Sequence, residues 1–259
     1  MVRVGAGASF FRECQLRSSL IHTAALGLLL LAVSASALGA SERPATEAAA
    51  QHELLLDNPR VLVERFVLQP GQSTSPHSHS SDQLLVFVKG GVLKSAATGR
   101  STLWRDGRVI WHSSTNSSDD VSRNVGPEPI VMIWVTLKPV LAAASAAGGG
   151  KEPRPDQHLN YPNIPGEDLL ENSRVIVQRF TVNPGQWEGV HAHRPNMLYI
   201  HIKGGQWAAR SRKEPEHPYP EASPDGEVGW MAPIDISEGH ESGNVGPQPI
   251  DLVWVTLKE

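Results

Sequence analysis

Two segments of the sequence carry paired histidines behind the same kind of turn. Segments 71–79 and 185–193 each read as a glycine, five residues, and then His-x-His. In an extended chain, residues i and i+2 point to the same face and lie about 6.6 Å apart. Two imidazoles so placed can bind one metal ion through nitrogen atoms at about 2.1 Å. The candidate ligands are His77 and His79 in the first segment and His191 and His193 in the second.

A metal site needs at least one further ligand from a distant part of the chain. The second half of the sequence offers His240, which precedes Asn244 and the last apolar run. A single His-x-His in a β-rich chain is more often a surface or packing pair than a metal site. The recurrence of the pair behind an equal spacing therefore carries the metal prediction.

The two histidine pairs belong to an internal duplication. Segment 60–71 recurs as segment 174–185, with the shared pattern Arg-Val-x-Val-x-Arg-Phe followed by Pro-Gly. Three shorter stretches also recur in the same order. They are Lys-Gly-Gly at 89–91 and 203–205, Asn-Val-Gly-Pro at 124–127 and 244–247, and Trp-Val-Thr-Leu-Lys at 134–138 and 254–258. The chain is therefore predicted to hold two copies of one domain.

Each copy has the pattern of short β-strands. Its apolar residues alternate with polar ones or form short β-branched runs, separated by Pro-Gly, Gly-Gly and Asp-Gly turns. This pattern predicts an all-β fold with domains at 46–139 and 158–259, joined by an Ala/Gly/Pro-rich linker at 140–157. Because so small a barrel has a modest core, we expect the two barrels to pack against each other within the chain, or to form a homodimer.

The histidine spacing carries a family resemblance. Gly-x5-His-x-His, together with His240 and Asn244, resembles the two-part motif of the cupins, and the duplication resembles a bicupin. The resemblance covers both copies. It implies two double-stranded β-helix (cupin or jelly-roll) barrels in tandem, with metal ligands at the barrel mouth. Carried over to the second copy, it implies the ligands His191, His193 and His240, while Met197 stands where the family commonly has glutamate.

A neutral set of three histidines predicts a particular chemistry. It leaves coordination positions open and leaves the charge of a divalent cation uncompensated, which favours an anionic substrate or an oxygen-derived ligand. This resembles cupin dioxygenases and favours Fe as the metal, with Mn, Zn or Ni as alternatives. The leading hypothesis is an Fe(II)-dependent dioxygenase that acts on a small organic substrate. The alternatives are a non-catalytic protein that binds a metal or small ligand, and a metal-dependent isomerase or decarboxylase. Met197 disfavours the last, since such chemistry usually needs an acid or base where the family places glutamate.

The first copy departs further from the family pattern. Gln83 fills the glutamate position, and Asp120 stands where the third histidine is expected. A site of His77, His79 and Asp120 would suit Fe(II) as a two-histidine, one-carboxylate set. The alternative is that Asp120 lies in a solvated loop and that this copy has lost its site.

Several other polar residues could assist the site in the second copy. Strand alternation could turn His201 and Tyr199 inward, where they would support a ligand or transfer protons. The alternative is that both are buried parts of the barrel core. Asn124 and Asn244, which precede Val-Gly-Pro in the two copies, are predicted to serve turns.

The N-terminal segment predicts export. Residues 21–40 carry no formal charge, Arg3, Arg12 and Arg17 precede them, and Ala-Ser-Ala ends at Ala37. This is the pattern of a signal peptide at 1–37, which predicts a periplasmic or secreted protein. An uncleaved membrane anchor is the alternative. Cleavage would also remove Cys14, the one cysteine, so cysteine chemistry is excluded from the mature chain.

Composition and missing motifs exclude several function classes. The net charge is −4 and no long basic run occurs, so nucleic acid is not an expected partner. No nucleophile elbow, Walker loop or dinucleotide-binding glycine motif opens a helix, which excludes the corresponding hydrolases, kinases and dehydrogenases. The expected partner is a small-molecule ligand or substrate.

Overall fold

The computed structural model describes residues 50–75, 80–114, 121–139 and 158–258. The predicted signal peptide 1–37 and linker 140–157 lie outside these residues, as do His77, His79 and Asp120. Within the described part of the chain, no helix is long and apolar enough to cross a membrane.

The described residues of the first copy form eight strands. The short apolar runs that the sequence separates by turns form these strands, as expected for β-branched residues on a pleated surface. They are β1 (Gln51–Asp57), β2 (Val61–Leu68), β3 (Gln83–Lys89), β4 (Gly91–Ser95), β5 (Ser101–Trp104), β6 (Val109–His112), β7 (Ser122–Asn124) and β8 (Ile130–Leu137).

The second copy repeats this series of strands and adds a 3-10 turn. Its elements are β9 (Glu167–Glu171), β10 (Val175–Val182), β11 (Met197–Lys203), β12 (Trp207–Arg210), β13 (His217–Pro218), β14 (Val228–Met231), η2 (Ile236–Glu238), β15 (Glu241–Asn244) and β16 (Ile250–Leu257).

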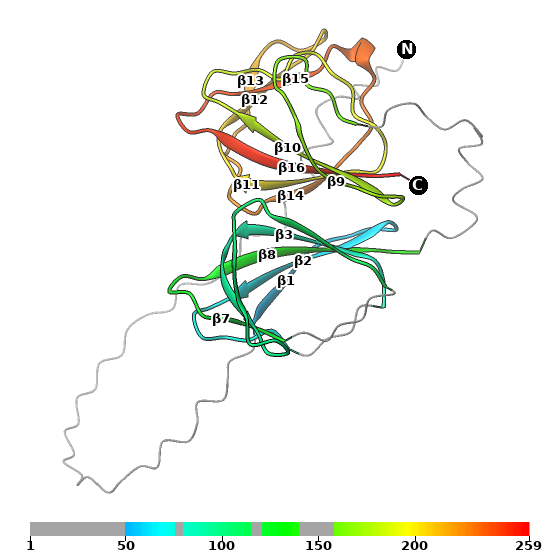
Figure 1. Ribbon diagram of the computed structural model, residues 1–259. Coiled ribbons are helices and arrows are strands. Elements are labelled where there is room, and N and C mark those ends of the chain that lie inside the picture. The colour runs from blue at the N-terminus through cyan, green and yellow to red at the C-terminus, as the bar shows by residue number, and fades with distance from the viewer. Residues whose placement is uncertain (1–49, 76–79, 115–120, 140–157, 259) are drawn as a thin grey trace, which may run out of the picture. The chain divides into compact units, whose positions relative to one another are not determined.

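Both copies have the same two-layer topology. The five-stranded sheets have the orders β1-β2-β8-β3-β6 and β9-β10-β16-β11-β14, and the three-stranded sheets have the orders β5-β4-β7 and β13-β12-β15. All the strand pairs are antiparallel. In the second copy, Figure 1 shows β12, β13 and β15 facing the larger sheet that contains β10, β16 and β11. This confirms the all-β prediction of two tandem barrels.

Strand alternation gives the larger sheet of the second barrel two buried faces. Along β10, Phe180 and Val182 point into the barrel and join a core with Met197 and Trp254. Alternate residues of the same sheet join a different apolar cluster, which also contains residues of β2, β3 and β8 from the first copy. Because consecutive side chains point to opposite faces, one strand can serve the barrel interior and this cluster at once.

Two buried asparagines play the same structural part in the two barrels. The Asn124 side chain donates to the carbonyl oxygens of Leu68 and Glu128. The Asn244 side chain likewise donates to the carbonyl oxygens of Val182 and Gln248, at 2.8 and 2.7 Å. Each amide oxygen also accepts the backbone N–H of the glycine two residues further on. These contacts confirm that both asparagines serve turns.

Candidate metal centre

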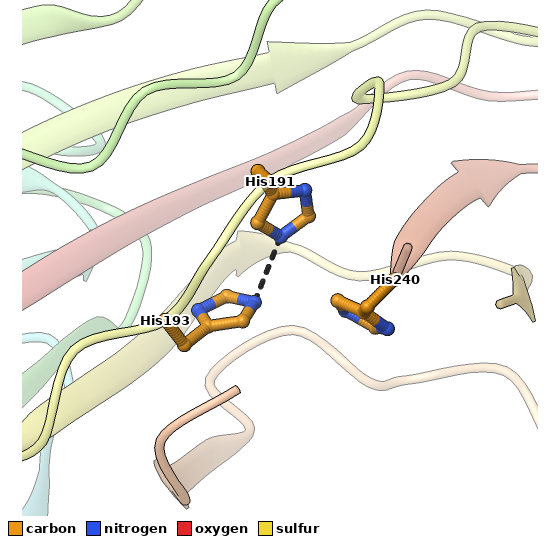
Figure 2. A group of neighbouring side chains, drawn as sticks. All are labelled: His191, His193 and His240. Carbon is orange, nitrogen blue, oxygen red and sulfur yellow. Dashed lines mark hydrogen bonds between the residues drawn. The ribbon is translucent and has the colours of Figure 1, made fainter. Parts of the chain in front are cut away.

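Three histidines of the second copy converge inside the barrel. Nitrogen atoms of His191, His193 and His240 all lie within 4.8 Å of one another. Figure 2 shows the three rings turned toward a shared space, with His191 and His193 on one segment and His240 opposite, just before β15. His191 and His193 are buried, whereas His240 is half-buried. The structure thus brings together the three residues singled out in the second copy.

Backbone pairing, rather than a continuous strand, positions these side chains. His191 lies outside the named strands, and His193 forms an isolated β-bridge with Ile234. The His191 backbone N–H donates to the carbonyl oxygen of His240 at 3.1 Å, which ties the two distant segments together. Before His240, Gly239 adopts a left-handed conformation with φ 64° and ends the 3-10 turn η2. The chain therefore reverses just before His240 and brings its ring to the other two.

The tautomer of His191 leaves its inner nitrogen available to a cation. His191 Nδ1 lies 2.8 Å from the carbonyl oxygen of Gly189, which can only accept, so Nδ1 carries the proton in the neutral ring. Its Nε2 then presents a lone pair toward His193 Nε2, 2.8 Å away. Figure 2 draws this contact as a hydrogen bond, in which His193 would donate. A metal ion bound between the rings would take the place of that proton, because two ligand atoms bonded at about 2.1 Å and at right angles lie about 3 Å apart.

Burial disfavours the protonated form of all three histidines. Burial lowers the pKa of His191 to about 4. It also lowers the pKa of His193 well below its ordinary value, an effect that the neighbouring histidines reinforce. The pKa of His240 is lowered for the same reason. Since a histidine binds metal through its neutral ring, the burial that disfavours protonation prepares the cluster for a divalent cation.

Aromatic side chains surround the histidine cluster. Tyr161, from the segment before β9, contacts the His191 ring edge-on at 4.6 Å between centroids. Trp254, on β16, contacts His193 at 5.1 Å. The Tyr161 hydroxyl and the Trp254 indole nitrogen are both buried, and the hydroxyl interacts with the Glu188 side chain and with Trp254. The histidine cluster is therefore bordered by polar groups as well as by aromatic rings.

Glu188 is a further polar residue at the centre, and the histidine spacing did not reveal it. Its side chain is 4% exposed, and its Oε2 lies 3.8 Å from His191 Nε2. Burial raises the pKa of Glu188 to about 8. Glu188 stands within the interval between the turn glycine and the first histidine, where the family pattern specifies no residue type. An acidic residue within the five-residue interval before the first histidine is the sequence signal that could have identified it.

The other candidates of the second copy make contacts within the barrel core. Met197 is fully buried, and its sulfur accepts the backbone N–H of Arg194. The Tyr199 ring contacts Trp254, which also contacts His193. His201 is next along the same face of the strand, and its Nε2 accepts the Trp207 indole N–H at 3.1 Å. This environment is that of a hydrogen-bonded core histidine.

In the first copy, Gln83 is the described member of the candidate site. Its side-chain amide donates to the Thr136 hydroxyl at 3.0 Å. His77, His79 and Asp120 lie outside the described residues, so a metal site in this barrel stays a prediction.

Comparisons with solved structures find proteins of similar fold at low sequence identity. No protein-family model and no curated protein matches the sequence. The putative glyoxylate-induced protein from Pseudomonas aeruginosa matches in structure with a TM-score of 0.53, at 12% identity over 80% of each chain. AerE from Microcystis aeruginosa matches with a TM-score of 0.52, at 14% identity over 83% of this chain and 95% of its own. A cupin 2 conserved barrel domain protein from Leptotrichia buccalis matches with a TM-score of 0.46, at 9% identity over 83% and 91% of the two chains.

The two copies have the same fold, and the second one contains the histidine cluster. Both copies share one antiparallel two-layer topology, and the structural matches extend over both of them. The chain therefore has the cupin fold in two tandem barrels, and the second barrel holds a three-histidine cluster suited to a divalent metal ion.

Proposed function

We propose that the protein is an exported metalloprotein whose second barrel binds a divalent transition metal through His191, His193 and His240. The observation that carries this proposal is the convergence of three neutral, largely buried imidazoles from two distant segments. We further propose Fe(II)-dependent dioxygenase activity on a small organic substrate. Three protein nitrogens leave coordination positions for both the substrate and O2.

The protein's own residues supply orientation and exclude water. When bound, the metal would activate O2 and hold the substrate. The contact from His191 Nδ1 to the Gly189 carbonyl oxygen fixes which nitrogen faces the ion. The apolar core next to the rings, which includes Phe180 and Leu252, limits the access of water. The buried Tyr161 hydroxyl and Trp254 N–H border the cluster, where they could donate to a substrate oxygen.

One observation favours a second candidate, a metal-dependent isomerase or decarboxylase. The sequence disfavours this class because Met197, which is neither an acid nor a base, stands at the family's glutamate position. Glu188 restores a carboxyl group beside His191, and its raised pKa would keep it protonated at neutral pH. A protonated acid next to a metal can donate a proton to a reacting carbon or oxygen. The non-catalytic binding protein remains the third candidate.

Metal content and oxygen uptake test the proposal in sequence. The protein purified without chelator should contain about one metal ion per chain, or two if the first barrel also binds. The His191→Ala variant should lose the ion of the second barrel and remain folded, whereas His217→Ala should keep it, because His217 lies exposed on the short strand β13. A wild-type protein that stays metal-free after incubation with Fe, Mn, Zn and Ni would refute the metal site.

With metal in place, an oxygen electrode separates the candidate functions. Catechols, diketones and thiols should each be tested with the Fe(II)-loaded protein. Oxygen uptake with one class, lost in His191→Ala, would support the dioxygenase. Product formation without oxygen uptake would instead support the isomerase or decarboxylase. If neither oxygen uptake nor product formation occurs, the non-catalytic binding protein is favoured.

Export requires a separate test, because the predicted signal peptide lies outside the described residues. The sequence pattern of residues 1–37 supports it. Mass spectrometry of the protein recovered from its native host should find a mature N-terminus close to residue 38. A full-length chain in the membrane fraction would indicate the uncleaved anchor instead.

A further inference from the structure

The second copy has a longer loop than the first beside its smaller sheet. The interval between the Lys-Gly-Gly and Asn-Val-Gly-Pro stretches is six residues longer in the second copy. Most of this extra length lies between β12 and β14, where the chain turns at 211–214 before it reaches β13. The second copy therefore has a segment after β12 that the first copy does not match in length.

Ser211 closes the turn at the start of this loop. Its backbone N–H donates to the carbonyl oxygen of Glu214 at 2.9 Å. Its hydroxyl accepts the backbone N–H groups of Lys213 and Glu214, both at 3.2 Å. Serine hydroxyls that bind the backbone two and three residues further on stabilise turns. Arg212 is therefore presented from a turn that is held by its own hydrogen bonds.

Arg212 contacts the backbone directly before His240 in two ways. Its backbone N–H donates to the carbonyl oxygen of Glu238 at 3.0 Å. Its side chain covers Gly239 so closely that a Cβ atom added to the glycine would lie 2.5 Å from Arg212 Cγ. Gly239 is buried, although residues 235–238 before it are mostly exposed. The aliphatic part of Arg212 thus packs over the glycine whose left-handed conformation directs the chain to His240.

The residue after His240 is held from the same part of the loop. The Arg210 guanidinium donates to the Glu241 carboxylate at 2.7 Å across the pair of β12 and β15. This support matters because His240 comes from a segment distant from His191 and His193 and is the least buried of the three. Ligand atoms must stay within about 0.5 Å of their productive positions for a metal site to form.

We infer that Arg212 is a positioning residue for the metal site of the second barrel. Its side chain holds Gly239 in place and so fixes His240 against His191 and His193. This inference rests on the proposed metal site and adds to it a residue of the loop that lengthens the second copy. Without the side chain all three ligands remain, but His240 moves more freely, so a bound ion is released faster. Uptake that begins at the two buried histidines does not depend on Arg212.

Three variants test this role. Arg212→Ala removes the side chain that covers Gly239 and keeps the backbone N–H that binds Glu238. Arg212→Lys keeps the Cγ and Cδ methylene groups and should therefore restore the contact. Lys213→Ala is the matched control, because Lys213 is an exposed residue of the same turn. The wild type and the variants should be stripped of metal, and the uptake of Co2+ should be followed by stopped-flow absorbance. The release of Co2+ should be followed after addition of excess chelator.

A positioning role predicts a change in release alone. Arg212→Ala should release Co2+ at least about fourfold faster than the wild type, the factor that corresponds to the lost burial of one methylene group. Its uptake rate and the thermal unfolding of its metal-free form should match those of the wild type. Arg212→Lys and Lys213→Ala should match the wild type in all three measurements.

The outcomes that contradict the inference are distinct from a failure of the metal site. Release from Arg212→Ala that is as slow as from the wild type would show that Arg212 does not position His240, and the three-histidine site would stand. Fast release from Arg212→Lys as well would show that the contact with Gly239 is not the cause. A lower unfolding temperature of metal-free Arg212→Ala would assign the fast release to a general loss of stability. If the wild type does not bind Co2+, the proposed metal site itself fails.

Discussion

The protons released when metal binds provide a quantitative test of the electrostatics of the site. A metal can occupy the cluster only after each ligand has lost its proton, so the number released reports the protonation of the metal-free protein. The decisive comparison is between the wild type and Glu188→Gln, because the variant isolates the contribution of the histidines. Zn2+ at pH 6.0 is a suitable probe, since imidazole binds it well.

The expected numbers follow from the pKa shifts. An ordinary histidine with a pKa of about 6.5 is roughly three-quarters protonated at pH 6.0, so three such residues would release more than about two protons. Here burial lowers the pKa of His191 to about 4, so it is almost fully deprotonated at this pH, and the pKa values of His193 and His240 are lowered as well. Burial raises the pKa of Glu188 to about 8, so it holds one proton. We expect fewer than two protons per Zn2+ from both proteins, and fewer from Glu188→Gln than from the wild type, because the variant lacks the proton that Glu188 holds.

Calorimetric titrations in buffers with different ionisation enthalpies measure this number directly. The slope of the observed enthalpy against the buffer enthalpy gives the protons released per ion bound. Release of two or more protons by Glu188→Gln would refute the conclusion that burial keeps the histidines neutral. Equal release by the two proteins would show that Glu188 does not lose a proton when metal binds.

Two further predictions concern the scaffold around the site. Because burial lowers the pKa of His201 to about 4, the unfolded chain binds more protons than the folded one between pH 6.5 and 4, and stability falls as the pH is lowered through this range. Denaturant unfolding should therefore show that the advantage of the wild type over His201→Gln shrinks by about 2 kcal/mol between pH 7 and pH 4.5. A stability advantage of the wild type that does not change with pH would contradict the lowered pKa of His201. Asn244→Ala should destabilise the protein by about 3 kcal/mol, because it leaves the carbonyl oxygens of Val182 and Gln248 unpaired in the interior. Asn124→Ala is the matched change in the first barrel, and a loss below about 1 kcal/mol in both variants would show that the two turns do not depend on these side chains.

Local patterns in the sequence determined the architecture and most of the candidate centre. Alternating apolar residues and turn dipeptides predicted strands, because side chains in a strand point alternately to two faces and because turns need glycine or proline. The repeated segments predicted two like barrels, and the structure shows one topology for both. The glycine-to-histidine spacing singled out His191 and His193, and the family resemblance added His240.

Only the tertiary structure decided what surrounds these ligands. Glu188 lies beside His191 because hydrogen bonds join it to Ser242, which is distant in sequence. Tyr161 reaches the same ring from a segment before the first strand of the barrel. No periodicity or spacing encodes such approaches, because they depend on which distant segments pair. The lowered pKa values of the histidines have the same origin, since desolvation results from the packing of the whole barrel around them.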